Sequence, residues 1–244
     1  MKKLFFVPVL AFLSLTSASV AEVKPKYGPL VTLLSTSHSY ILKNPAPDFW
    51  ALIPYYVGQQ DDRFCSVAST SMVVNGARVG RKHTADDELA TQTGVLTRAK
   101  NDIWNKGVGV GGHGVSLDEL GPIVAAGLKA YGVDNAQVEI IHTDDQSKEV
   151  KAKLHQALVE NEKSADDFIM INFNQGSYTG DADAGHIAPI AAYDASTKRV
   201  LVLDPDRRWY EPYWVSEETL LKGMATSDAV SGKFRGYVWV KLKK

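Results

Sequence analysis

The chain contains one cysteine, Cys65, and this cysteine stands at a predicted helix start. Polar and charged residues precede it, and small and apolar residues follow, with Ala68, Met72 and Asn75 spaced for one helical face. Peptide N–H groups at a helix N-terminus stabilise a thiolate, which is the nucleophilic form of cysteine. A free cysteine is more often a small buried hydrophobic residue, so the assignment of Cys65 as a nucleophile needs support from other residues.

His186 and Asp204 provide that support. His186 precedes a predicted strand over residues 187–193, and Asp204 follows a second one over 200–203. The two residue numbers average to 195, inside the hairpin loop 194–198, so antiparallel pairing would place the side chains opposite or nearly opposite each other, with Cβ atoms roughly 4.5 to 8 Å apart. We predict that Asp204 accepts a hydrogen bond from Nδ1–H of His186 and leaves Nε2 facing the nucleophile.

Gln59 is a fourth candidate catalytic residue, and the order of the four residues along the chain is informative. A glutamine precedes Cys65 by six positions, Gly185-His186 enters a strand much later, and Asp204 lies one hairpin beyond. This order matches the plan of papain-like cysteine hydrolases, in which the glutamine amide and the backbone N–H of the cysteine bind the oxyanion. A histidine beside a strand is more often solvated or capped, and the weight therefore rests on the order of all four residues.

The surrounding pattern changes from helices to strands along the chain. Helices are predicted from Cys65, from about Thr84, from Ser116 with its capping box to Glu119, and over 148–161. Strands are predicted over 168–173, 187–193, 200–203 and 237–240, residues 22–58 are expected to be extended, and the glycine-rich segment 107–114 is expected to be a flexible loop. The prediction is an α+β papain-like cysteine hydrolase fold, with the helical lobe that carries the nucleophile packed on an antiparallel sheet.

The first 21 residues predict a secretory signal peptide. Two lysines precede an apolar run over residues 4–15, and small residues end at Ala21. The run is shorter than the roughly 20 apolar residues needed to span a bilayer. We expect residues 22–244 to form a single catalytic domain that is exported to the periplasm or the extracellular space, with no membrane contact in its mature form. A free cysteine in such an oxidising compartment favours a chemical role.

Composition indicates an ordinary globular domain. Hydrophobic residues make up 45% of the chain and charged residues 23%, which excludes a disordered or fibrous class. The formal net charge is −1 and no block of basic residues occurs, so a nucleic-acid partner is not expected.

Several motifs resemble phytochelatin synthase in sequence and order. The similarity runs from about residue 49 to residue 242 and is to the short bacterial members of that family that carry only the catalytic domain. The similar segments are 64–69 with Asn75, 116–121, 172–173, 185–193, 203–207, 212–215, 224–231 and 235–238.

This resemblance implies a reaction and a set of catalytic residues. Members of the family attack the Cys–Gly bond of glutathione, release glycine and hold γ-glutamylcysteine as a thioester. Water then gives γ-glutamylcysteine, or a second glutathione gives the phytochelatin oligomer. By matched motif, Cys65 is the nucleophile, His186 the general base and then acid, Asp204 its orienting residue, and Gln59 the oxyanion donor. We expect hydrolysis to dominate, with phytochelatin synthesis as a minor reaction.

The resemblance also implies residues that bind the substrate. Asp228 and Arg235 match residues that hold the γ-glutamyl amino and carboxylate groups, an ion-pair chemistry that suits both side chains. Asn172 and Gly185 are further expected substrate contacts. No cofactor is required, and a heavy-metal ion such as cadmium would enter as a metal–glutathione thiolate substrate. With one cysteine, the chain cannot chelate a thiophilic metal through several thiolates.

The sequence departs from the family pattern in places. Ser66 stands where glycine is usual and is expected to crowd the oxyanion site or the substrate backbone. The loop between Asn172 and His186 is longer by one residue. The cysteine-rich C-terminal region of the plant enzymes does not occur in this sequence.

Three alternatives remain open at this stage. The first is a periplasmic papain-like cysteine protease or amidase of other specificity, and the second is a non-catalytic glutathione-binding protein. The third is a metal site at His113, His142 and Asp144, whose spacing is scattered. A homodimer is also left open.

Overall fold

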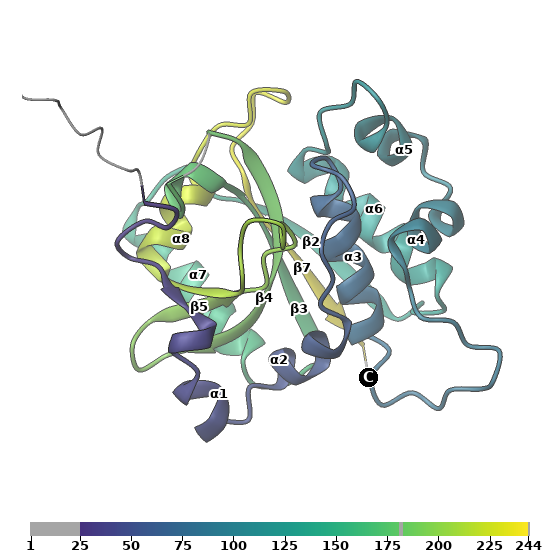
Figure 1. The fold of residues 1–244 in the computed structure, drawn as a ribbon, viewed down its shortest axis with the longest axis horizontal. Helices are drawn as coiled ribbons and strands as arrows, with labels where there is room; N and C mark the ends of the chain where they lie inside the picture. Colours follow the sequence, from purple (N-terminus) through teal and green to yellow (C-terminus); the bar gives the residue numbers. More distant parts are fainter. Residues whose placement is uncertain (1–24, 181–182, 244) are drawn as a thin grey trace, which may run out of the picture.

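The computed structural model describes residues 25–180 and 183–243, so the predicted signal peptide lies outside the described residues. Within the described ranges, seven strands form one sheet in the order β1-β6-β5-β4-β3-β7-β2, and every neighbouring pair is antiparallel (Figure 1). The strands are β1 (Thr32–Leu33), β2 (Ala136–His142), β3 (Asp167–Asn174), β4 (Gly185–Asp194), β5 (Arg199–Val202), β6 (Tyr213–Ser216) and β7 (Gly236–Leu242).

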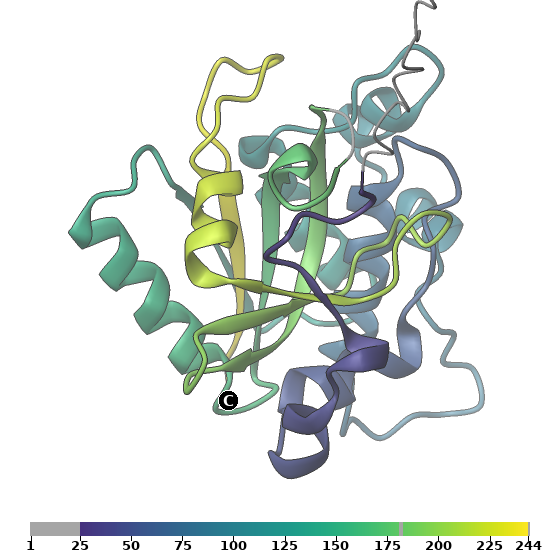
Figure 2. The same cartoon turned by 60° about the vertical axis from the view of Figure 1, so that its left-hand side comes forward.

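Helices cover the two faces of the sheet unequally. A lobe on one side contains α2 (Pro47–Leu52), α3 (Cys65–Gly76), α4 (Gln92–Ala99), α5 (Asp102–Val108) and α6 (Leu117–Ala130), with α3 against the middle of the sheet (Figure 1). The helices α7 (Lys148–Asn161) and α8 (Glu217–Met224) cover the other side, and α1 (Ser39–Lys43) lies near the sheet end below them (Figure 2). The predicted α+β fold, with a nucleophile-bearing helical lobe on an antiparallel sheet, is confirmed.

Strand β3 shows why residues 168–171 are apolar without a break. Successive side chains of a strand point to opposite faces. Phe168 and Met170 therefore join the core shared with α3, whereas Ile169, Ile171 and Phe173 join the core on the opposite face. Because both faces are covered, an unbroken apolar run is the sequence signature of this central strand.

Helix α3 is buried along its whole length, which fixes its position against the sheet. The hydroxyl of Ser69 donates to the carbonyl oxygen of Ile187 on β4 at 3.0 Å. The Asn75 side chain donates to the carbonyl of Ala90 at 2.9 Å and accepts its N–H at 2.8 Å. These bonds tie the first half of α3 to the strand that carries His186, and its end to the segment before α4.

The predicted helix starts are partly correct. Ser116 and Glu119 form the expected capping box of α6, and α7 has the predicted bounds. The helix predicted from Thr84 is wrong, because the Asp87 carboxylate accepts the Thr84 N–H at 2.7 Å and closes a turn there. The lead-in is also not extended throughout, since it contains the helices α1 and α2 beside the short edge strand β1, which is extended as predicted.

The predictions missed two strands. β2 and β6 had no assignment, and β2 is an edge strand with every residue at least partly exposed, which weakens its sequence signal.

In residues 25–180 and 183–243, no helix combines the length and apolar character required to cross a bilayer.

Candidate active site

Cys65 is the first residue of α3, as the sequence predicts. The preceding residue, Phe64, supplies no side-chain cap to the helix. The first N–H groups of α3 therefore remain available to anionic groups, because a helix leaves its initial donors without intrahelical partners. Cys65 is 7% exposed, so its thiol is sheltered near the protein surface.

His186 is the second residue of β4 and is 5% exposed. Its backbone pairs with Phe173 of β3, and the Phe173 ring meets the imidazole edge to face with 5.5 Å between centroids. Cys65 lies beside the imidazole of His186. The Ser69–Ile187 bond, one residue along β4, holds the two elements at this separation.

Asp204 completes the triad from a fully buried position. One carboxylate oxygen, Oδ1, lies 2.7 Å from Nε2 of His186 and accepts the N–H of Asp206 at 2.9 Å. The other, Oδ2, accepts the hydroxyl of Tyr213 at 2.8 Å. The backbone carbonyl of Asp204 accepts the Tyr56 hydroxyl at 2.6 Å, so both the carboxylate and its main chain are fixed.

The structure corrects the predicted orientation of the imidazole. Asp204 binds Nε2 rather than Nδ1, which leaves Nδ1 for Cys65. The predicted cross-strand opposition is also wrong. The hairpin pairs Asp194 with Arg199, β5 ends at Val202, and a bulge shifts the register, so Asp204 reaches His186 from the loop beyond the ladder. The residue pair was predicted correctly, but its geometry was not.

Burial and charge favour an ionised His186–Asp204 pair. Burial alone lowers the pKa of His186, but the charge and hydrogen bond of Asp204, together with Cys65, hold that pKa well above the ordinary histidine value. Burial alone raises the pKa of Asp204, whereas His186 and hydrogen bonds from Asp206 and Tyr213 bring it below the ordinary value. An anionic Asp204 beside a protonated imidazole stabilises a neighbouring thiolate.

Gln59 lies against the segment that follows Asp204. Its backbone N–H donates to the carbonyl of Pro205 at 2.7 Å, one residue beyond Asp204. The adjacent loop is braced by Gln92, whose side chain donates to the Gly58 carbonyl at 2.8 Å and accepts the Gln60 N–H at 3.1 Å. Gln59 and His186 line the same cleft. The four predicted catalytic residues are thus brought to one region.

This cleft has a volume of about 560 Å³. Beyond Gln59 and His186, its wall includes Gly185, Gln175 and two residues that the sequence analysis did not single out, Lys26 and Trp209. The volume is in the range of small-molecule sites. No spacing pattern in the sequence relates Lys26 to Trp209, because their proximity depends on how the lead-in crosses the sheet.

Three of the four predicted substrate residues meet beside His186. Asn172 on β3 pairs with Ile187 of β4 on one side and with Gly236 of β7 on the other. Arg235, which precedes Gly236, therefore lies next to the point where these three strands pair. Arg235 packs over Gly185, where an added Cβ would lie 3.0 Å from Nη2. Gly185 therefore leaves room for a guanidinium that is 7% exposed. The Arg235 group donates to Thr226 Oγ1 at 3.1 Å.

Two buried polar atoms near the point where β3, β4 and β7 pair lack hydrogen-bond partners among the described residues. They are Oδ1 of Asn172 and Nε of Arg235. Buried polar groups are normally hydrogen-bonded, so an acceptor and a donor without partners at one place suit a polar ligand. Asp228 differs, because its Oδ1 accepts the N–H groups of Val230 and Ser231 in its own loop, at 2.8 and 3.0 Å.

Ser66 does not crowd the oxyanion site as expected. Its hydroxyl accepts the indole N–H of Trp104 at 3.0 Å, and both residues are fully buried in the helical lobe. The side chain thus points into the core that α3 shares with α5. Serine at this position supplies a packing contact that a glycine could not make.

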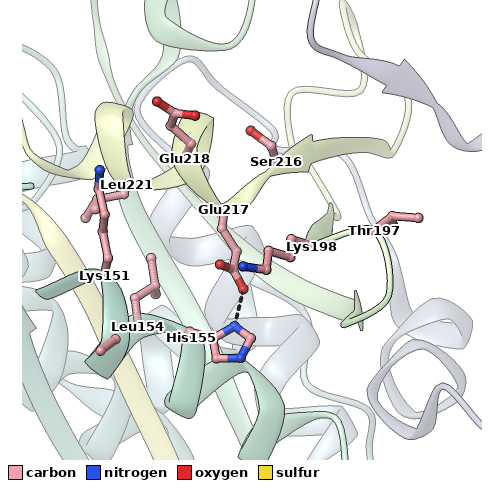
Figure 3. Close-up of a pocket in the computed structure, with 10 residues that line it drawn as sticks. Lys151, Leu154, His155, Thr197, Lys198, Ser216, Glu217, Glu218 and Leu221 are labelled. Atoms are coloured by element: carbon pink, nitrogen blue, oxygen red, sulfur yellow. Dashed lines mark hydrogen bonds and ion pairs between the residues drawn. The ribbon is translucent and has the colours of Figure 1, made fainter. Parts of the chain in front are cut away.

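A second cavity, of about 520 Å³, lies between α7, α8 and the β4–β5 hairpin (Figure 3). His155 of α7 contacts Glu217 of α8 at 2.7 Å, and Lys151 and Lys198 lie on its walls. It contains none of the four predicted catalytic residues.

The metal-site alternative does not hold. His142 contacts Asp118 Oδ1 at 2.8 Å and the carbonyl of Phe234 at 2.5 Å, so both of its ring nitrogens are engaged. Within the described part of the chain, no three histidine, cysteine or acidic residues are grouped as metal ligands.

Comparison with known proteins places the chain in a family. A family model described as phytochelatin synthase matches residues 30–237. Glutathione gamma-glutamylcysteinyltransferase 1 of Lotus japonicus is 26% identical over 199 residues, which is 79% of this chain and 35% of that protein. Glutathione gamma-glutamylcysteinyltransferase of Schizosaccharomyces pombe is 26% identical over 194 residues, covering 78% and 42%. The chain therefore spans well under half the length of these relatives.

A solved structure, the crystal structure of the Pseudomonas avirulence protein AvrPphB, aligns with 79% of this chain and 100% of its own. The identity is 11% and the TM-score 0.36, a similarity too low to carry an argument.

Proposed function

We propose that this chain, which belongs to the phytochelatin synthase family, cleaves the Cys–Gly bond of glutathione through a thioester on Cys65. The observation that carries the proposal is the placement of a complete Cys65–His186–Asp204 triad beside the buried guanidinium of Arg235. A nucleophile with an oriented base fits acyl transfer, and a buried guanidinium fits a substrate carboxylate.

Acylation begins at the Cys65 thiolate. Its sulfur forms a bond to the carbonyl carbon of the Cys–Gly peptide, and the carbonyl oxygen becomes an oxyanion. The Gln59 side-chain amide and the N–H of Cys65 would bind this oxyanion. The C–N bond then breaks, His186 gives its proton to the departing nitrogen, and glycine leaves. Asp204 keeps the ring oriented throughout.

Deacylation regenerates the thiolate. His186 removes a proton from water, the oxygen attacks the thioester carbon, and the C–S bond breaks to release γ-glutamylcysteine. The α-amine of a second glutathione can replace water and give the phytochelatin oligomer. Because water is always present at high concentration, we propose that hydrolysis is the main reaction and that transfer increases with glutathione concentration. Cadmium would act through its glutathione thiolate, as a substrate.

The direct test follows glycine release by mass spectrometry with residues 22–244 and glutathione. Cys65→Ala should release no glycine and should retain the circular dichroism spectrum and melting temperature of the parent. A glutathione series with and without cadmium then separates γ-glutamylcysteine from oligomer. Oligomer that dominates at low glutathione would overturn the hydrolase assignment. Cleavage of other peptides or amides without cleavage of glutathione would favour the alternative cysteine protease or amidase, and binding without turnover the non-catalytic alternative.

Export is a separate proposal, based on the first 21 residues of the sequence. Intact-mass analysis of the protein from a bacterial periplasmic fraction should give a chain that begins at Glu22. A mass that retains Met1 would contradict it.

A further inference from the structure

The segment around Lys26 is fixed against the cleft although it precedes the family match, which begins at residue 30. The N–H of Gly28 donates to the carbonyl of Tyr178 at 3.0 Å, and the N–H of Gly180 donates to the carbonyl of Lys26 at 2.8 Å. The purple N-terminal segment in Figure 2 therefore runs antiparallel to residues 178–180. This backbone pairing brings Lys26 to the wall of the cleft that contains His186.

Two aromatic rings hold the Lys26 ammonium, and no carboxylate of residues 25–180 and 183–243 forms an ion pair with it. Its Nζ lies 4.6 Å from the centre of the Trp209 ring and 5.2 Å from that of Tyr210. Aromatic faces attract a cation through their quadrupole and leave its charge and hydrogen-bond donors available. Trp209 also lines the cleft, so the stacked ammonium lies at its edge.

The other charges of the cleft make this ammonium important for an anionic ligand. Asp62 and Asp206 line the same wall, and Lys26 is the sole lysine or arginine among the described lining residues. A carboxylate that entered the cleft would meet repulsion from Asp62. Lys26 can offset this repulsion, whereas Asp62 suits an amino group.

The leaving group of the proposed reaction has this combination of charges. His186 must reach the departing nitrogen to protonate it, so the glycine lies on the His186 side of the scissile bond. Its carboxylate is attached to the carbon next to that nitrogen. The attacking amine of a second glutathione also carries a carboxylate on the adjacent carbon. One cation on this side can therefore serve both the leaving and the attacking group.

We infer that Lys26 determines specificity on the leaving-group side of the cleft by binding the carboxylate next to the departing or attacking nitrogen. The inference rests on the proposed cleavage of glutathione. It assigns recognition of this carboxylate to a residue outside the family-matched region, and recognition of the γ-glutamyl end to Arg235, which packs on Gly185.

The test compares glutathione with its analogue in which the glycine carboxylate is a carboxamide. For the parent, kcat/KM should be higher with glutathione than with the amide. Lys26→Gln should reduce kcat/KM for glutathione about fivefold or more, the scale of a partly exposed ion pair. It should leave kcat/KM for the amide unchanged, so the preference disappears. Lys26→Arg should retain the preference, and Lys43→Gln, an exposed change on α1, should match the parent.

The outcomes separate this inference from the proposed function. If the parent cleaves neither compound, glutathione cleavage and the role of Lys26 both fail. If the parent cleaves glutathione and the amide equally, or if Lys26→Gln keeps the preference, glutathione cleavage stands and the role of Lys26 is overturned. An equal loss for both compounds would show that Lys26 supports the fold of the cleft, which also overturns the inference.

Discussion

Nε2 of His186 and Oδ1 of Asp204 lie 2.7 Å apart, and neither side chain is appreciably exposed to solvent. This contact leaves Nδ1 of the imidazole for Cys65. It also places a carboxylate where its charge favours the protonated ring over the neutral one. The catalytic state of Cys65 thus depends on a residue that does not touch the substrate.

Asp204→Asn should retain more activity than Asp204→Ala. The asparagine oxygen can accept from His186 Nε2–H and from the Asp206 N–H, while its nitrogen faces the Tyr213 hydroxyl, which can accept. Loss of the charge should lower the pKa of His186, so the alkaline limb of kcat/KM should move to lower pH. A pH profile of both variants measures this, and equal loss of activity in both would show that the charge is indispensable.

Ser66→Ala should reduce stability without raising the rate. The substitution leaves the buried Trp104 indole N–H without its acceptor, which destabilises the folded state by about 1 to 3 kcal/mol. Urea unfolding and kcat with glutathione are the two measurements. Ser71→Ala provides a comparison inside the same helix, because its hydroxyl donates only to the carbonyl of Ala68. A faster Ser66→Ala enzyme of unchanged stability would restore the idea that serine crowds the oxyanion site.

Asp228→Asn separates two roles of one side chain. Asparagine can still accept the Val230 and Ser231 N–H groups that Asp228 accepts, but it cannot pair with an ammonium. If Asp228 holds the γ-glutamyl amino group, kcat/KM for glutathione should fall about tenfold or more while the melting temperature stays near the parent value. Unchanged turnover would show that Asp228 only stabilises its own turn. Recognition of the γ-glutamyl end would then depend on Arg235, and Arg235→Gln tests that role.

Asp48→Asn should stabilise the protein at pH 8 but not near pH 4. Asp48 is 1% exposed, and its pKa is raised by burial and then by the charges of Asp167 and Glu162. The pKa of Glu162 is likewise raised, to about 7, chiefly by burial. A raised folded-state pKa gives stability that is complete below about pH 4 and is lost as pH rises through the folded value.

Thermal unfolding of the parent and of Asp48→Asn between pH 4 and pH 8 measures this effect. The parent melting temperature should fall as pH rises, and the two curves should diverge toward pH 8. Asp134→Asn, at an exposed position, is the control and should follow the parent. A constant difference between parent and Asp48→Asn at every pH would exclude a titration effect.

The sequence by itself determined the features that depend on local patterns. The switch from helical to strand periodicity predicted the α+β fold, the Ser116–Glu119 spacing predicted the start of α6, and the polar-to-apolar change placed Cys65 at the start of α3. The order of Gln59, Cys65, His186 and Asp204 predicted a set of catalytic residues, and the structure brings these four residues to one region.

Only the tertiary structure decided how these elements meet. The β-bulge and the early end of β5 determine that Asp204 contacts Nε2, and no local pattern encodes a register shift of that kind. The burial of Ser66 against Trp104 and the stacking of Lys26 on Trp209 join residues far apart in the chain. Such contacts depend on long-range packing of whole elements, whereas periodicity and capping signals report only on a few neighbouring residues.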